Sequence, residues 1–199
     1  MRVWSTLLAS LIAWTVALGP GGDESEPSLA GRLLVAEPEL ADPNFVRTVV
    51  LLLHHDAEGA MGLVVNRRYG RVPIADLLRR LGRDARGASG ETELYYGGPV
   101  EPDVGTVLHD AGYRGSDARE IGAGLAATHD PAILEAMARR QGPRQARIVL
   151  GYAGWGPGQL ESELAQGAWA TIPADPRLVL APDPERVWER ALARRGVDL

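Results

Sequence analysis

The stretch from Arg47 to Asn66 constrains the fold more than any other part of the chain. Its first half, RTVVLLLHH (Arg47–His55), is an unbroken run of β-branched residues and leucines, which indicates a buried strand. The turn residues DAEG (Asp56–Gly59) follow, and the apolar run resumes in AMGLVVN (Ala60–Asn66). Two apolar runs joined by a short turn predict an antiparallel β-hairpin.

Three segments carry the start and stop residues of helices. Proline is favoured in the first turn of a helix, and glycine is favoured just after its last residue. The three predicted helices begin at Pro73, at Asp130–Pro131 and at Asp183–Pro184, and they end at Gly82, Gly142 and Gly196, respectively.

Further apolar runs predict strands between these helices. TELYYGG and VGTVLHD flank a predicted loop at Gly97–Asp103, ARIVLGY (Ala146–Tyr152) predicts another strand, and AWATI a last one. The strands come in pairs with helices placed irregularly between them, without the strict alternation of a doubly wound fold. We therefore expect a single compact α+β domain with a mainly antiparallel, partly barrel-like β-sheet flanked by helices.

The N-terminal residues differ in character from the rest. Val3–Leu18 is an apolar run of about 16 residues behind Arg2, and a Gly-Pro-Gly-Gly break follows it. Such a run is shorter than the roughly 20 residues of a spanning helix and matches the core of a signal peptide. We predict a signal-like or membrane-anchor segment at 1–22, a polar linker at 23–29 and the folded domain at 30–199. The expected location is exported or membrane-tethered; a start codon assigned too far upstream would instead leave a cytoplasmic domain.

Composition excludes several kinds of chemistry. The chain has no cysteine, and its 21 basic residues are all arginine. A cysteine nucleophile, a thiolate zinc site, a lysine Schiff base and the usual phosphate-binding P-loop are therefore excluded.

One segment is basic although the whole chain carries a net charge of −5. Between Arg67 and Arg86 there are seven arginines against Asp76 and Asp84, which gives 7 − 2 = +5. Basic patches meet phosphate groups in nucleic-acid-binding proteins, so a direct nucleic-acid binder is an alternative. A solvated helix face followed by a mobile loop also explains the charge, and no helix-turn-helix pattern is present. We therefore expect no sequence-specific DNA binding.

The glycine-rich stretch GYAGWGPGQLESEL (Gly151–Leu164) predicts a strand, a turn and a short helix. The strand is expected to end at Tyr152, with a turn at Ala153–Gly156 and with Pro157 in the first helical position.

This prediction gives the two tryptophans of the region different environments. Trp155 would be a loop side chain, whereas Trp169 would begin a strand after the helix stop at Gly167 and pack inward. Gln159 and Glu163 lie one helical turn apart and are expected on the side of Trp155.

Three blocks of the sequence resemble the signature blocks of the YqgE/AlgH family. They are LLVAEPELADPNFVRTVVLLLHHDAEGAMGLVVNR, YYGGPVEPDVGTVLHD and GYAGWGPGQLESELAQGAWA, in the order and at the spacing of that family. The similarity covers roughly Ala30 to Leu199. It implies a compact α+β fold with a small β-barrel, in bacterial proteins of which some are linked to transcriptional regulation. The sequence departs from the family at Glu37, where methionine is usual, and in the apolar N-terminal segment, since members are usually cytoplasmic.

Histidines offer one route to a catalytic site. His55 and His109 are each predicted at the end of a strand, with Asp56 and Asp110 beside them. If these strand ends meet, the four side chains have the types found in a metal-dependent hydrolase or another small-molecule enzyme. This stays an alternative, because local hydrogen bonding explains a polar strand end equally well.

A non-enzymatic binding or regulatory role fits the sequence better. Two Gly-Pro loops offer backbone donors and one aromatic face, which suit a small anion, a peptide or a partner's loop. The candidate ligand-binding residues are Gly97, Gly98, Pro99, Gly154, Trp155, Gln159 and Glu163. We expect no catalytic residue, metal or cofactor, and an unidentified protein or small molecule as the partner through which transcription would be regulated.

Overall fold

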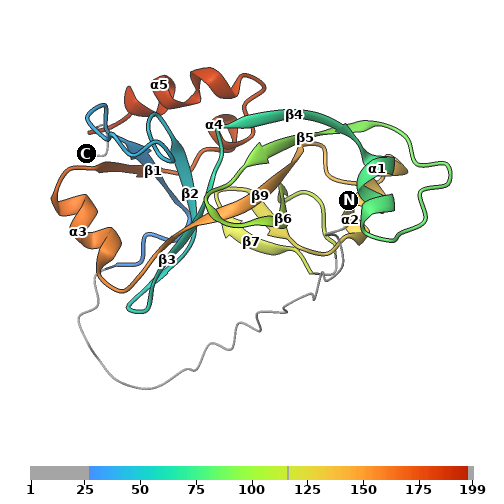
Figure 1. Ribbon diagram of the computed structural model, residues 1–199, viewed down its shortest axis with the longest axis horizontal. Coiled ribbons are helices and arrows are strands. Elements are labelled where there is room, and N and C mark those ends of the chain that lie inside the picture. The colour runs from blue at the N-terminus through green and yellow to red at the C-terminus, as the bar shows by residue number, and fades with distance from the viewer. Residues whose placement is uncertain (1–26, 116, 197–199) are drawn as a thin grey trace, which may run out of the picture.

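The computed structural model describes residues 27–115 and 117–196, in which ten strands form one curled sheet covered by short helices (Figure 1). The strands are β1 (Arg32–Ala36), β2 (Val49–Asp56), β3 (Gly59–Val64), β4 (Arg68–Pro73), β5 (Glu91–Tyr96), β6 (Val100–Asp110), β7 (Arg119–Gly122), β8 (Leu125–Thr128), β9 (Ala146–Trp155) and β10 (Trp169–Pro173). The helices are α1 (Ile74–Arg80), α2 (Ala132–Ala138), α3 (Gln159–Ala165), α4 (Pro176–Val179), the 3₁₀ helix η1 (Pro184–Arg186) and α5 (Val187–Leu192).

The predicted α+β class is confirmed. The sheet order is β10-β1-β2-β3-β9-β6-β8-β7, and β5 pairs with both β4 and β9. Every pairing is antiparallel except β5 with β9, which is parallel. The predicted β2–β3 hairpin forms, with Asp56 opposite Gly59.

Strands β1 and β2 are buried on both faces. Leu33 and Val35 belong to a cluster under α4 and α5, whereas their neighbours Leu34 and Ala36 belong to a second cluster with Leu160 of α3. A third cluster packs α1 and α2 on the other half of the sheet. Burial on both faces explains why these strands are continuous apolar runs without polar alternation.

Strand β9 joins the two halves of the molecule and runs across its middle in Figure 1. Its first half lies between β5 and β6, and its last residues pair with β3. The strand changes neighbours at Gly151, where φ is +71° and an added Cβ would lie 2.6 Å from the carbonyl oxygen of Gly98. An added Cβ on Gly98 would lie 2.1 Å from the backbone of Tyr152. Glycine is therefore required here because two backbones cross at contact distance.

Three boundaries differ from the sequence prediction. The predicted turn at Ala153–Gly156 is wrong, because β9 continues to Trp155 with Ala153 and Trp155 facing inward and Gly154 outward. The predicted loop at Gly97–Asp103 ends early, because β6 begins at Val100. Strand β4 was not predicted, since it is an exposed edge strand interrupted by Gly70 and has no apolar alternation.

The helix ends agree with the prediction in two places and differ in two. Gly82 and Gly167 follow α1 and α3 with positive φ, as expected. Helix α2 does not end at Gly142; it ends at Ala138, and Arg140 takes the left-handed conformation with φ +59°. The last helix was predicted to end at Gly196, but it consists of η1 followed by α5, which ends at Leu192.

The N-terminal predictions concern residues that are mostly outside the described part. The segment 1–22 and the first residues of the linker 23–29 lie there. The last linker residues contact the domain, because the Ser28 hydroxyl and the Leu29 N–H both bond to His55. No helix within residues 27–115 and 117–196 has the length and apolar character needed to span a membrane.

Candidate functional site

Two tryptophans pack together at the α3 end of the molecule. Trp155 and Trp169 are only 6% and 4% exposed, and their ring centroids lie 6.0 Å apart in an edge-to-face arrangement. Phe45 stacks on Trp155 at 6.1 Å and meets Trp169 edge-on at 5.6 Å. The prediction that Trp155 is a loop side chain is therefore wrong, and the inward packing of Trp169 is confirmed.

Glu163 of α3 satisfies both indole groups. Its Oε2 accepts the Trp155 Nε1–H at 2.9 Å and the Trp169 Nε1–H at 2.8 Å. Its Oε1 accepts from the Gln159 amide at 2.9 Å. The Gln159 oxygen in turn accepts the backbone N–H of Gly156 at 3.1 Å. The predicted residues Trp155, Gln159 and Glu163 are thus brought together, as one internally bonded network.

The other predicted ligand-binding residues are Gly97, Gly98, Pro99 and Gly154. They lie where the loop between β5 and β6 passes over β9. The Gly97 N–H donates to the Leu150 carbonyl at 2.7 Å, so this loop donor is occupied. Gly97 and Gly98 are buried against β9, whereas Pro99 and Gly154 are exposed. Backbone packing accounts for the two glycines of the GGP loop.

The two histidines proposed as a catalytic pair do not meet. His55 pairs with Ala60, which pairs with Trp155 at one end of β9, whereas His109 pairs with Ala146 at the other end. Each has local partners: His55 Nε2 lies 2.7 Å from Glu161, and His109 Nδ1 donates to the Asp110 carbonyl at 2.8 Å. In the described residues no three His, Asp or Glu side chains are grouped closely enough to hold a metal ion. The enzyme alternative based on His55 and His109 therefore lacks its geometry.

His55 connects the start of the domain to α3. Its Nδ1 accepts the Leu29 N–H at 3.0 Å, so Nε2 carries the proton and donates to Glu161. The pKa of Glu161 lies below its usual value because its own backbone N–H and the His55 ring donate to the carboxylate.

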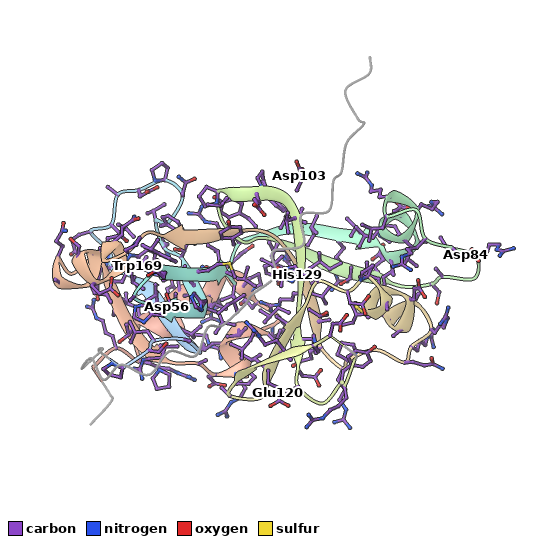
Figure 2. All side chains as sticks on the ribbon, turned by 90° about the horizontal axis from the view of Figure 1, so that it is seen from below. Asp56, Asp84, Asp103, Glu120, His129 and Trp169 are labelled. Atoms are coloured by element: carbon purple, nitrogen blue, oxygen red, sulfur yellow. The ribbon has the colours of Figure 1, made fainter. Side chains whose placement is uncertain are left out.

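The basic segment is partly neutralised by two acids within it and two from elsewhere in the chain. Adding Glu93 and Glu135 to the two acids within the segment lowers its charge from +5 to 7 − 4 = +3. Five of its seven arginines form ion pairs: Arg68 and Arg71 with Glu93, Arg79 with Asp76, Arg83 with Glu135 and Arg86 with Asp84. Figure 2 shows Asp84 at the end of the molecule opposite Trp169.

A cleft of about 490 Å³ lies in the α1–α2 half of the molecule, where β5 and β9 begin. Four arginines line it, and two carboxylates oppose them, so its charged side chains sum to 4 − 2 = +2. The charged lining residues are Arg71, Arg140, Arg144, Arg147, Glu91 and Glu93.

Arg147 is the buried member of this set. Its side chain projects from the apolar strand β9, the residue is only 3% exposed, and its guanidinium lies 4.4 Å over the Tyr95 ring. Nη1 donates to the carbonyls of Val65 and Val179 at 3.0 and 2.5 Å, and Nη2 donates to the carbonyl of Ala181. Within the described residues no carboxylate lies within 4.0 Å of this cation. Burial lowers the pKa of Arg147, but a guanidinium stays charged at neutral pH.

Glu93 lies opposite Arg147 on β5 and acts on it through its charge, but at more than 4.0 Å, because its oxygens bond to other side chains. It accepts the Tyr95 hydroxyl at 2.9 Å and pairs with Arg68 at 3.2 Å and Arg71 at 3.7 Å. Burial acts to raise the pKa of Glu93, but the bonds from Tyr95 and Arg68 and the positive charges of Arg147 and Arg68 outweigh it, so the pKa lies below its usual value. Burial also raises the pKa of Tyr95 to about 12, so its hydroxyl remains a donor.

Comparison of the sequence with known proteins assigns the chain to a family. The family model described as AlgH-like matches residues 33–199. The chain belongs to the AlgH-like family. A UPF0301 protein of Methylococcus capsulatus is 43% identical over 88% of this chain and 96% of its own length. A UPF0301 protein of Xanthomonas euvesicatoria is 43% identical over 86% of this chain and 91% of its own.

Two solved structures agree with the architecture described above. The solution structure of the AlgH protein from Pseudomonas aeruginosa has a TM-score of 0.70, with 40% identity over 89% of this chain and 94% of that one. A crystal structure from Corynebacterium diphtheriae has a TM-score of 0.67 at 24% identity over 89% and 92% of the two chains, which supports the fold alone. The resemblance found in the sequence is therefore confirmed.

The family signature blocks of this AlgH-like chain do not contain the arginine cleft. Arg140, Arg144 and Arg147 precede the third block, and sequence reasoning missed them. One signal was present, since Arg147 is a single charge inside the apolar run ARIVLGY. Glu37, which departs from the family pattern, pairs with Arg195 near the end of the chain.

Proposed function

We propose that this AlgH-like protein is a non-enzymatic binding protein whose ligand is a small anion held in the arginine cleft. One observation carries the proposal: Arg147 is a buried cation that borders the cleft and has no carboxylate partner in the described residues. Leaving a buried charge unpaired costs several kcal/mol, so native proteins normally supply a counter-charge. A bound anion would supply it.

The surroundings favour an anion over other ligands. Arg140 and Arg144 line the same cleft, and neither forms an ion pair within the described part of the chain. Arginine presents parallel N–H groups that match carboxylate and phosphate oxygens, and these charge-assisted bonds are the strong ones.

A regulatory role would follow from ligand-dependent contact with a partner. The cleft lies between α2, β5 and the C-terminal segment around Leu180, so a ligand would bridge parts of the chain that are far apart in sequence. We propose that regulation of transcription, as implied by the family resemblance, acts through a protein partner and not through direct DNA binding. The ion pairing of the Arg67–Arg86 segment supports this choice, because most of its charges already have partners.

Isothermal titration with inorganic phosphate and with succinate tests the anion proposal. The full chain should bind at least one of these probes, and the double variant Arg71→Gln/Arg144→Gln should bind it about 10-fold more weakly or worse. The matched control is Arg86→Gln/Arg114→Gln, which removes two exposed, acid-paired arginines outside the cleft and should bind like the wild type. Failure of the wild type to bind any of phosphate, succinate and glycerol 3-phosphate would overturn the proposal.

The location of the protein is a separate proposal. We propose that the apolar segment 1–22 exports or tethers the domain, which is supported by the family match beginning only at residue 33. Cell fractionation of the full chain and of a chain starting at residue 23 should place the first with the membrane or exported fraction and the second in the cytoplasm. Identical fractionation of the two chains would contradict it.

A further inference from the structure

Helix α2 ends in a motif that normally requires glycine. The Gln141 N–H bonds to the Ala136 carbonyl at 2.8 Å and the Arg140 N–H bonds to the Met137 carbonyl at 3.0 Å, which is the Schellman pattern. The residue in the left-handed position is Arg140, with φ +59°.

Two other helices of the same chain end in this motif with glycine. After α1, Gly82 has φ +67° and bonds to the Arg79 carbonyl; after α3, Gly167 has φ +73° and bonds to the Leu164 carbonyl. The left-handed conformation is unfavourable for a residue with a Cβ. Arg140 is therefore strained where the chain elsewhere uses glycine, and strain of this kind is characteristic of functional positions. Its side chain lines the cleft and has no bonding partner within the described residues.

Arg147 leaves two of its N–H donors unused. A guanidinium has five N–H donors, and the carbonyls of Val65, Val179 and Ala181 take three of them. The remaining two are Nε–H and one Nη2–H, on neighbouring nitrogens of the planar group. Donors on neighbouring guanidinium nitrogens match two oxygens of one oxyanion. The contact with Tyr95 and the three carbonyls fix the group in advance, so little side-chain freedom is lost on binding.

We infer that the cleft binds a phosphate dianion, with two oxygens on the two unused donors of Arg147 and a third oxygen on Arg140. The inference rests on the proposed anion-binding function and names its ligand class. A single carboxylate group has only two oxygens and one charge, and the second carboxylate of a dicarboxylate such as succinate is held away by the carbon chain. A phosphate offers three free oxygens and a charge near −2 on one group, to a cleft whose side chains sum to +2. The phosphate is either free or the end group of a small monoester.

The variant Arg140→Gly separates ligand binding from folding. Glycine suits the left-handed position, so the variant should melt about 2–4 °C higher than the wild type in the absence of ligand. It should also bind inorganic phosphate and glycerol 3-phosphate about 10-fold to 100-fold more weakly, because a charge-assisted contact is lost. Arg140→Gln keeps the strained backbone and should lose the same affinity without the gain in melting temperature. Arg139→Gly, a change at the neighbouring exposed residue outside the cleft, should leave affinity for both probes unchanged.

Titrations of the wild type with inorganic phosphate, glycerol 3-phosphate and succinate give the decisive comparison. Preference for either phosphate over succinate by about 10-fold or more supports the inference, and the tighter of the two identifies the source of the group. Succinate binding as tightly as both phosphates would overturn it and leave the anion proposal standing, and unchanged phosphate affinity in Arg140→Gly would overturn it as well. Absence of binding by all three probes would instead reject the proposed function.

Discussion

Both ends of strand β9 carry buried polar groups, and these groups have different kinds of partner at the two ends. At the C-terminal end, the buried N–H groups of Trp155 and its neighbour Trp169 both meet the carboxylate of Glu163. At the N-terminal end, the buried guanidinium of Arg147 meets three carbonyl oxygens and, among the described residues, no carboxylate. Buried polar groups are nearly always satisfied within a protein, and buried charges are paired. A complete network therefore indicates scaffold, and an incomplete one indicates a place for a ligand.

The largest expected effects concern the scaffold end. Trp155→Ala and Trp169→Ala should each lower the free energy of unfolding by about 3–5 kcal/mol, the usual cost of removing a buried tryptophan. Urea unfolding measures this, with Tyr69→Ala as the control, because Tyr69 is 62% exposed and should cost less than about 1 kcal/mol. A small loss for Trp155→Ala beside a large loss for Trp169→Ala would restore Trp155 as a candidate binding residue.

An intermediate effect is expected for the carboxylate between the indoles. Glu163→Ala leaves two buried N–H donors without an acceptor and should cost about 2–3 kcal/mol. Gln159→Ala, a change at an exposed residue of the same helix, should cost less than about 1 kcal/mol. Equal losses for the two variants would mean that the network does not hold α3.

The smallest effect concerns the His55–Glu161 contact. The pKa of Glu161 is lowered in the folded protein, so its contribution to stability is present above the unfolded-state pKa near 4.3 and is lost as pH falls through the folded value. Glu161→Gln should therefore flatten the decline in stability below about pH 4.5. The difference should stay below about 1 kcal/mol, because the carboxylate is 39% exposed and solvent screens it. Parallel stability curves for the two proteins would contradict this assignment.

Much of the scaffold could be predicted from the sequence, because local patterns determine it. The β2–β3 hairpin, the start of α1 after Pro73 and the glycine stop at Gly167 follow from apolar runs and from turn residues. The extension of β9 through Trp155 did not follow, because three nearby glycines indicate a turn and only pairing with β3 keeps the strand extended.

The arginine cleft could not be predicted in the same way. Arg71 of β4 and Arg147 of β9 are far apart in sequence and come together because both strands pair with β5, and the parallel β5–β9 pairing leaves no local pattern. The left-handed conformation of Arg140 was not predicted either, because the local pattern indicates a helix stop at Gly142, two residues later. His55 and His109 do not meet for a related reason. Each lies near the last residue of its strand, but the two strands place them at opposite termini of β9.

One paired measurement tests the central claim that the complete network is scaffold and the incomplete one is the site. Unfolding free energy and affinity for inorganic phosphate are measured on the same preparations of Glu163→Ala and of Arg140→Gln/Arg144→Gln. Glu163→Ala should lose about 2–3 kcal/mol of stability and keep its phosphate affinity within about twofold. The arginine variant should keep its stability within about 1 kcal/mol and lose phosphate affinity by about 10-fold or more. The reverse pattern, with affinity lost in Glu163→Ala and retained in the arginine variant, would contradict the account.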